Sequence, residues 1–228
     1  MTKEEYSVLV ESLLRGYKIE GCVIASVVDG LSLKLKFAID KVLGIDSLQI
    51  CDVLDYGVIL KTDNPSEVGA DRIANAVAVS NLYPNSSSIV VDFGTATTFD
   101  IVNSKREFLG GIIAPGVNTQ IKSLNSSTSK LPKIDVNISR AAIGRNTTDA
   151  ILSGVIRGSA CMIEGLLEQC KEELGGKVIT VATGGYSGLI ASYMKSSFDY
   201  VCPTLTLYGL SCIYYAQKNQ NSKLCCTK

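Results

Sequence analysis

In the first part of the chain, segments in which apolar residues recur at helical spacing alternate with short apolar runs typical of strands. Val8, Leu9 and Leu13, together with Leu14 and Tyr17, recur at the spacing of a helix, which predicts an amphipathic helix over 3–17. Further helical patterns and short apolar runs follow it. In chain order they predict a strand at 22–27, a helix at 31–43, strands at 48–51 and 58–61, and a helix at 67–83.

A second series of elements begins near residue 85. Three strand candidates at 88–92, 97–102 and 108–114 are separated by turns at 93–95 and 103–105, which predicts a meander. A polar tract at 125–130 is expected to be mobile or ordered by a ligand. The other segments predict helices at 117–124, 147–174, 187–195 and 205–217 and a strand at 177–182. We therefore expect two α/β units, 1–84 and 85–228, with no detectable sequence repeat.

Composition narrows the classes of partner. Of the 228 residues 46% are hydrophobic and 19% charged, and a chain of this kind is globular rather than disordered. The 22 basic residues balance the 22 acidic ones, so no excess positive field would attract a nucleic acid or an anionic bilayer. No run reaches the roughly 18 consecutive apolar residues of a membrane span. We expect neither a nucleic acid nor a membrane as partner.

The chain contains no histidine, which excludes Ser-His-Asp and Cys-His catalysis and histidine-ligated metals. A catalytic base must therefore come from another residue type. The eight cysteines include no CxxC pair and no metal-ligand spacing. The first residues are acidic where a signal peptide would be basic, and together with unpaired cysteines this predicts a cytoplasmic location.

A strand that leads into a Gly-Thr turn forms the first candidate site, at 92–100. Backbone N–H groups and hydroxyls at Gly94 and Thr95 can surround a phosphate, and the Asp92 carboxylate can hold a cation that offsets phosphate charge. Asp, Gly and Thr are also ordinary turn residues. The motif alone therefore fits a plain hairpin as well as a phosphate site.

The entry to the helix at 67–83 forms the second candidate site. Gly69 lets a ligand approach the backbone, Asp71 can accept a proton, and Arg72 offers a planar fork to a carboxylate or phosphate. The alternative is that Glu67 and Asp71 only complement the helix dipole in its first turn. Without a histidine in the chain, Asp71 is a credible base.

A glycine pair after a buried strand forms the third candidate site. Gly184 and Gly185 would let a nucleotide base or sugar lie against bare backbone, and Tyr186 could stack or pack there. A strand followed by two glycines and a helix is also a plain connection between elements.

In this order, these segments resemble those of the type III pantothenate kinases, members of the actin, sugar-kinase and Hsp70 superfamily. The resemblance runs from about residue 4 to the end of the chain. It implies two ribonuclease-H-like α/β domains of the actin-like ATPase superfamily. The matching stretches are 64–76, 90–100, 110–116, 128–132, 143–147 and 182–185.

The resemblance also implies a reaction and its site residues. The reaction is phosphorylation of pantothenate to 4′-phosphopantothenate by ATP with Mg²⁺, the first step of coenzyme A biosynthesis, with K⁺ or NH₄⁺ as activating cation. Asp71 would be the base and Asp92 the ligand of the monovalent cation. The pantothenate site would contain Gly69, Ala70, Asp71 and Arg72, and the ATP site Gly94, Thr95, Gly184 and Gly185.

The family resemblance further implies a homodimer with a shared active site. Thr147 would reach pantothenate from the neighbouring subunit. Gly154, Gly158 and Gly165 on the helix at 147–174 would let two helix backbones approach closely. We therefore expect a two-fold dimer built on this helix.

Two departures from the family pattern give a second hypothesis. Family members begin with an Asp-x-Gly-Asn-Thr turn that holds the ATP phosphates, and this sequence matches only after it, so the first domain is expected to lack its usual N-terminal strands. Thr62 and Asp63 stand where many members place a substrate-contacting Tyr. The alternative is a non-catalytic, pantothenate-kinase-like binding or regulatory protein. Retention of five chemical residues favours the kinase: Asp71, Arg72, Asp92, Thr95 and Thr147.

Overall fold

A six-stranded sheet forms the centre of the protein in the computed structural model, which describes residues 1–26, 30–53, 55–126 and 134–225. The strand order is β3-β6-β5-β4-β7-β8. The middle of the sheet is the predicted antiparallel meander, and β3, β7 and β8 pair with their neighbours in parallel. The strands are β3 (Ile59–Leu60), β4 (Ser87–Phe93), β5 (Ala96–Val102), β6 (Glu107–Pro115), β7 (Val178–Thr183) and β8 (Tyr200–Val201).

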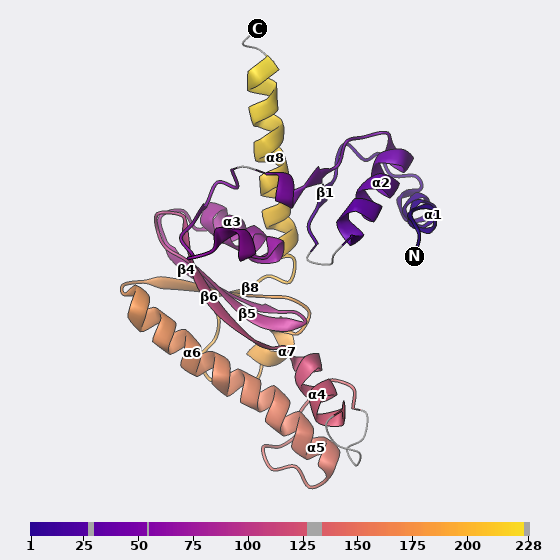
Figure 1. The fold of residues 1–228 in the computed structure, drawn as a ribbon. Helices are drawn as coiled ribbons and strands as arrows, with labels where there is room; N and C mark the ends of the chain where they lie inside the picture. The colour runs from indigo at the N-terminus through magenta and orange to yellow at the C-terminus, as the bar shows by residue number, and fades with distance from the viewer. Residues whose placement is uncertain (27–29, 54, 127–133, 226–228) are drawn as a thin grey trace.

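Helices cover both faces of this sheet (Figure 1). On one face lie α3 (Ala70–Leu82) and α8 (Leu205–Cys225), and on the other lie α6 (Gly158–Leu174) and α7 (Ser187–Ala191). The sheet has one hydrophobic core on each face. Side chains alternate along β4, so Ile89 and Val91 lie in the core on the α6 side while Val90 lies in the core beside α3. Asp92 follows Val90 in this alternation, and its side chain accordingly faces α3.

The N-terminal segment forms a smaller unit beside α8 (Figure 1). Helices α1 (Lys3–Leu14) and α2 (Leu31–Leu43) pack together near a parallel pair of two-residue strands, β1 (Val23–Ile24) and β2 (Leu48–Gln49). Two short 3₁₀ turns, η1 (Ile50–Asp52) and η2 (Pro65–Glu67), lead from this unit to α3. The division of the chain at residue 84 stays a prediction.

A wide turn interrupts the long helix predicted at 147–174. The helix consists of α5 (Thr147–Leu152), a π-helical turn η3 (Ser153–Arg157) and α6. At this turn the Ser153 hydroxyl donates to the Ala142 carbonyl at 2.6 Å, and Arg157 donates to the Ser139 carbonyl at 3.2 Å. These bonds hold the loop before α5 against the helix.

The same helix is the one candidate membrane span among the described residues. Thr147–Leu174 contains an 18-residue window with a mean hydropathy of 1.5, of which 44% is buried inside the protein. The apolar residues Val155, Ile156 and Ile163 pack against the central sheet in the core on the α6 side. The helix therefore serves as a core helix, with part of its surface left exposed by the described residues.

Several predicted elements differ in extent from the observed ones. The first helix ends at Leu14 rather than at 17, and the strand predicted at 22–27 is observed as the two-residue strand β1. The helix predicted at 67–83 is a 3₁₀ turn followed by α3. The sequence missed β8, because two exposed residues carry no alternating pattern. Helix α4 (Val117–Ser126) runs into the predicted polar tract, and residues 127–133, which include the match at 128–132, lie outside the described residues.

Candidate active site

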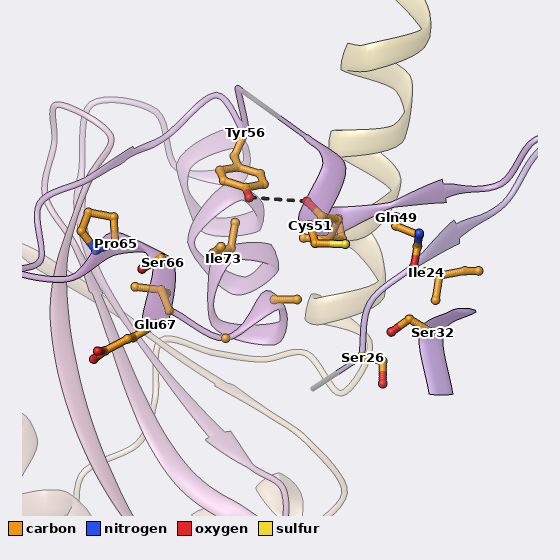
Figure 2. A pocket seen from close by; sticks show the side chains of 14 residues that line it. Ile24, Ser26, Ser32, Gln49, Cys51, Tyr56, Pro65, Ser66, Glu67 and Ile73 are labelled. Atoms are coloured by element: carbon orange, nitrogen blue, oxygen red, sulfur yellow. Dashed lines mark hydrogen bonds between the residues drawn. The ribbon is translucent and has the colours of Figure 1, made fainter. Parts of the chain in front are cut away.

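The turn into α3 borders a cavity of about 510 Å³ (Figure 2). Gly69 and Ala70 line it, together with η2 on one side and residues of β1, β2 and η1 on the other. The Tyr56 hydroxyl donates to the Ile50 carbonyl at 3.4 Å and closes one end of this space. Pro65 at the start of η2 fixes the backbone before the helix. Two of the five residues predicted to bind pantothenate therefore lie at one cavity.

Asp71 lies in the first turn of α3 with its side chain exposed to solvent. Its Oδ1 atom accepts a hydrogen bond from the Arg72 backbone N–H at 2.8 Å. The carboxylate therefore satisfies an N–H group at the start of the helix, as the dipole interpretation requires. Exposure also leaves it accessible to a substrate hydroxyl, so the two interpretations are compatible.

Arg72 is held by three groups of the sheet. Its Nε donates to Asp100 Oδ1 at 2.6 Å, its Nη2 donates to the Phe99 carbonyl at 3.1 Å, and its guanidinium lies over the Phe108 ring at 5.2 Å. Glycine at 111 makes this possible, because a Cβ there would lie 2.6 Å from Nη2. The guanidinium therefore has a fixed position beside the start of α3.

Asn75 joins two carboxylates one turn further along α3. Its Nδ2 donates to Asp100 Oδ2 at 3.0 Å and to Asp92 Oδ2 at 3.3 Å. Its Oδ1 accepts from the Thr206 hydroxyl of α8 at 2.8 Å. The amide thereby connects α3, β4, β5 and α8 in one polar network.

The carboxyl groups of this network have raised proton affinity. Burial raises the pKa of Asp100 to about 6, against the opposing effects of Arg72 and Asn75. Burial also raises the pKa of Asp92, with the charge of Asp71 acting in the same direction and the Asn75 hydrogen bond opposing it. Asp100 forms the ion pair with the Arg72 guanidinium, and Asp71 and Asp92 add negative charge near that pair, which a bound cation would offset.

The turn between β4 and β5 presents Gly94 and Thr95 to solvent. The Thr95 carbonyl accepts from the Gly116 N–H at 3.1 Å and from the Thr119 hydroxyl at 2.7 Å. A Cβ at position 116 would collide with the carbonyls of the turn, so glycine is needed there. The Thr95 carbonyl is thereby turned toward α4 and held there.

Gly184 lies against Asp92 where β7 ends. Because β4 and β7 are parallel, with Asp92 beside Thr183, their carboxyl ends meet at one edge of the sheet, the usual place for a ligand in α/β folds. Gly184 has a φ of +86°, and a Cβ there would lie 2.6 Å from Asp92 Oδ1. No atom in the described part of the chain lies within 4 Å of the Cβ position at Gly185. Glycine is therefore required at 184, where the backbone packs against Asp92, whereas the space beside Gly185 is open.

Thr147 lies at a different cavity from Gly69. It lines a space of about 720 Å³ between α4 and the α5–η3 segment, which is also lined by Thr119, Ile151 and Gly154. Because Thr119 bonds the Thr95 turn, this cavity adjoins the predicted phosphate site. Nothing described lies within 4 Å of the Cβ positions of Gly154, Gly158 and Gly165.

The structure brings four of the ten predicted site residues to one polar network and adds others. Asp71, Arg72, Asp92 and Gly184 lie around one polar network. Sequence reasoning assigned no role to Asn75, Thr206 or Gly111. Asn75 could have been found, since it follows Asp71 by four residues and therefore lies on the same helix face. Thr206 could not, because only the tertiary fold brings α8 to α3.

Comparison with known proteins gives concordant matches. The sequence model of the family described as type III pantothenate kinase matches residues 1–169. A type III pantothenate kinase of Moorella thermoacetica is 42% identical over 218 residues, covering 93% of this chain and 85% of that protein. Another, of Dehalococcoides mccartyi, is 41% identical over 220 residues, covering 94% and 83%.

A solved structure matches the fold. A crystal structure from Campylobacter jejuni, described as a Baf family transcriptional activator, superposes with a TM-score of 0.60 at 21% identity. The match covers 92% of this chain and 89% of that one. At this identity the similarity concerns the fold alone.

Proposed function

The chain belongs to the type III pantothenate kinase family, with the α/β fold of the actin-like ATPase superfamily, and we propose that it transfers the γ-phosphoryl group of ATP to the hydroxyl of pantothenate. The products are 4′-phosphopantothenate and ADP, and the reaction belongs to coenzyme A biosynthesis. The cytoplasmic location predicted from the sequence is part of this proposal.

The observation that carries this proposal is an exposed carboxylate beside an immobilised guanidinium. Asp71 accepts the proton of the pantothenate hydroxyl as that oxygen attacks the γ-phosphorus atom. Arg72, fixed by Asp100 and the Phe99 carbonyl, directs its remaining N–H groups at the substrate. Gly69 and Ala70 leave the backbone open to pantothenate at the neighbouring cavity. Positioning of this kind supplies much of the rate of a phosphoryl transfer.

The nucleotide lies across the carboxyl ends of β4 and β7. Gly94 and Thr95 contact the phosphates, and the open position at Gly185 leaves room for the nucleoside, while Gly184 lets the end of β7 approach Asp92. ATP arrives with its own Mg²⁺, which offsets phosphate charge beside the three carboxylates. Asp71, Asp92 and Asp100 would otherwise repel a bare triphosphate.

The residues beside Asp92 fit a monovalent cation. The buried Thr183 hydroxyl has no hydrogen-bond partner among the described residues, and its position beside Asp92 in the parallel pair puts both side chains on one sheet face. A carboxylate and a hydroxyl are oxygen donors suited to K⁺ or NH₄⁺. Asp92 and Thr183 would hold the ion, which would supply positive charge near the phosphates.

A second copy of the chain completes the site. Part of the surface of the apolar helix Thr147–Leu174 is not buried, and no atom of the described residues lies within 4 Å of the Cβ positions of Gly154, Gly158 and Gly165. We expect two such helices to pack across a two-fold axis, with Thr147 of each copy reaching pantothenate in the other. This arrangement accounts for the separation of Thr147 from the cavity at Gly69.

Pantothenate-dependent release of ADP from MgATP tests the proposal, with the product identified by mass. Asp71→Asn should lower turnover by about 10²–10⁴-fold, the usual contribution of a positioned base. Asp55→Asn is the matched control, since it removes an exposed carboxylate outside the network that, like Asp71, accepts a backbone N–H. A purified, folded wild-type protein that releases no ADP in the presence of pantothenate would contradict the proposed function.

A further inference from the structure

Asn75 is buried at the centre of the polar network and is 0% exposed. It therefore cannot touch a substrate in the described structure. Its side-chain amide nevertheless bonds groups from three other elements: Asp92 of β4, Asp100 of β5 and Thr206 of α8. An uncharged buried side chain with this many charged and polar partners is a candidate for holding other groups in place.

The surrounding charges fix the orientation of the amide. With Nδ2 toward the carboxylates, both of its hydrogens are donated, and Oδ1 accepts from the Thr206 hydroxyl at 2.8 Å. The opposite orientation would turn the amide oxygen toward two carboxylates and remove both donors. Thr206 therefore supports the orientation that the carboxylates require.

The two carboxylates that share this amide serve different parts of the site. Asp100 anchors the guanidinium of Arg72, and Asp92 borders Gly184 at the carboxyl ends of the strands. Both are acidic groups near the charge of Asp71, and Asn75 supplies each with a neutral donor. One amide thus sets the distance between the guanidinium anchor and the carboxylate that faces the nucleotide.

We propose that Asn75 is a positioning residue of the kinase, which couples the cation-binding carboxylate Asp92 to the substrate-binding Arg72, with Thr206 holding its amide in register. This inference rests on the proposed function. It predicts that loss of the amide weakens monovalent-cation binding and pantothenate binding together, although neither ligand touches Asn75. A purely structural role would change stability only.

Asn75→Leu tests this directly, because leucine has a similar volume and no polar atom. We expect the half-activating K⁺ concentration and the KM for pantothenate each to rise about ten- to a hundredfold, the usual effect of losing a hydrogen bond to a charged group. The rise in melting temperature that K⁺ causes relative to Na⁺ should also disappear. Val79→Ala, at a buried apolar position of the same helix, should lower stability and leave all three quantities unchanged.

Unchanged K⁺ and pantothenate responses in folded Asn75→Leu protein would overturn the inference. If that variant does not fold, Thr206→Val decides, since it removes only the supporting hydroxyl. An unchanged half-activating K⁺ concentration in Thr206→Val would then overturn the inference, and an increase of several fold would support it. The melting shift with K⁺ needs no turnover, so it tests Asn75 even if the wild type fails to phosphorylate pantothenate.

Discussion

Arg72 Nε lies 2.6 Å from Oδ1 of Asp100, a carboxylate that is 0% exposed. A guanidinium at the start of a helix is thereby tied to the middle of the central sheet. Because the Asp100 carboxylate is buried, removing either residue of the pair would leave the charge of the other residue uncompensated. The fixed geometry of this pair is the basis of the first two predictions.

Arg72→Lys should raise the KM for pantothenate about ten- to a hundredfold and leave a folded protein. Lysine keeps the positive charge, but it cannot bond Asp100 and the Phe99 carbonyl with two separate N–H groups in the same plane. Steady-state kinetics at saturating MgATP measures the change. Arg106→Lys is the matched control, since Arg106 also bonds backbone carbonyls, at Gly57 and Ser80, away from Asp71. Equal KM values in the two variants would contradict the role of Arg72.

The titration of Asp100 should make stability fall as pH rises from about 4 to about 6. Its pKa is about 6 in the folded protein and 3.8 ordinarily, so the folded state binds more protons in this range. This contribution is fully present below pH 4 and is lost as the pH passes through 6. Asp100→Asn should flatten the slope. The groups facing Asp100 are Arg72, Asn75 and Asp71, and all three are unchanged in the variant.

Urea midpoints measured between pH 4 and pH 7 for the two proteins test this prediction. Because the other carboxyl groups are common to both, the difference between the two curves isolates Asp100. Parallel curves would show that folding does not raise the pKa of Asp100 above its ordinary value.

The sequence predicted the elements with strong periodicity and the residues that carry recognisable chemistry. The strands of the meander were predicted from their apolar runs, and Asp71, Arg72 and Asp92 from residue type and the turns around them. The family resemblance was confirmed by the matching family model and relatives. The assignment of individual site residues and the dimer stay predictions.

Features that depend on tertiary contacts could not be predicted. Strand β8 has two exposed residues and owes its conformation to pairing with β7. The partners of Asn75 come from segments up to 131 residues away in sequence, so no local pattern indicates them. The need for glycine at 209 also has no local signal. A Cβ there would collide with the Ala74 carbonyl, because α8 packs closely on α3.

Gly184→Ala should lower both stability and activity, while Gly185→Ala should change neither strongly. Alanine at 184 would place a Cβ 2.6 Å from Asp92 Oδ1 at a φ of +86°, and strain of this kind costs about 1–3 kcal/mol. At position 185 the added Cβ would have no atom of the described residues within 4 Å. Urea denaturation and the KM for MgATP, measured on both variants, test the contrast. Equal effects at the two positions would contradict the close approach of Gly184 to Asp92.

Mixing two impaired variants tests the shared site. If Thr147 acts in the site of the other subunit, Asp71→Asn and Thr147→Ala protomers form heterodimers in which one site has both native residues and the other has neither. Random pairing after joint refolding makes half of the dimers heterodimers, so activity should recover to about a quarter of the wild-type value. Each variant refolded alone is the control. A site contained within one chain cannot gain from mixing, and activity equal to the mean of the two controls would contradict the shared site.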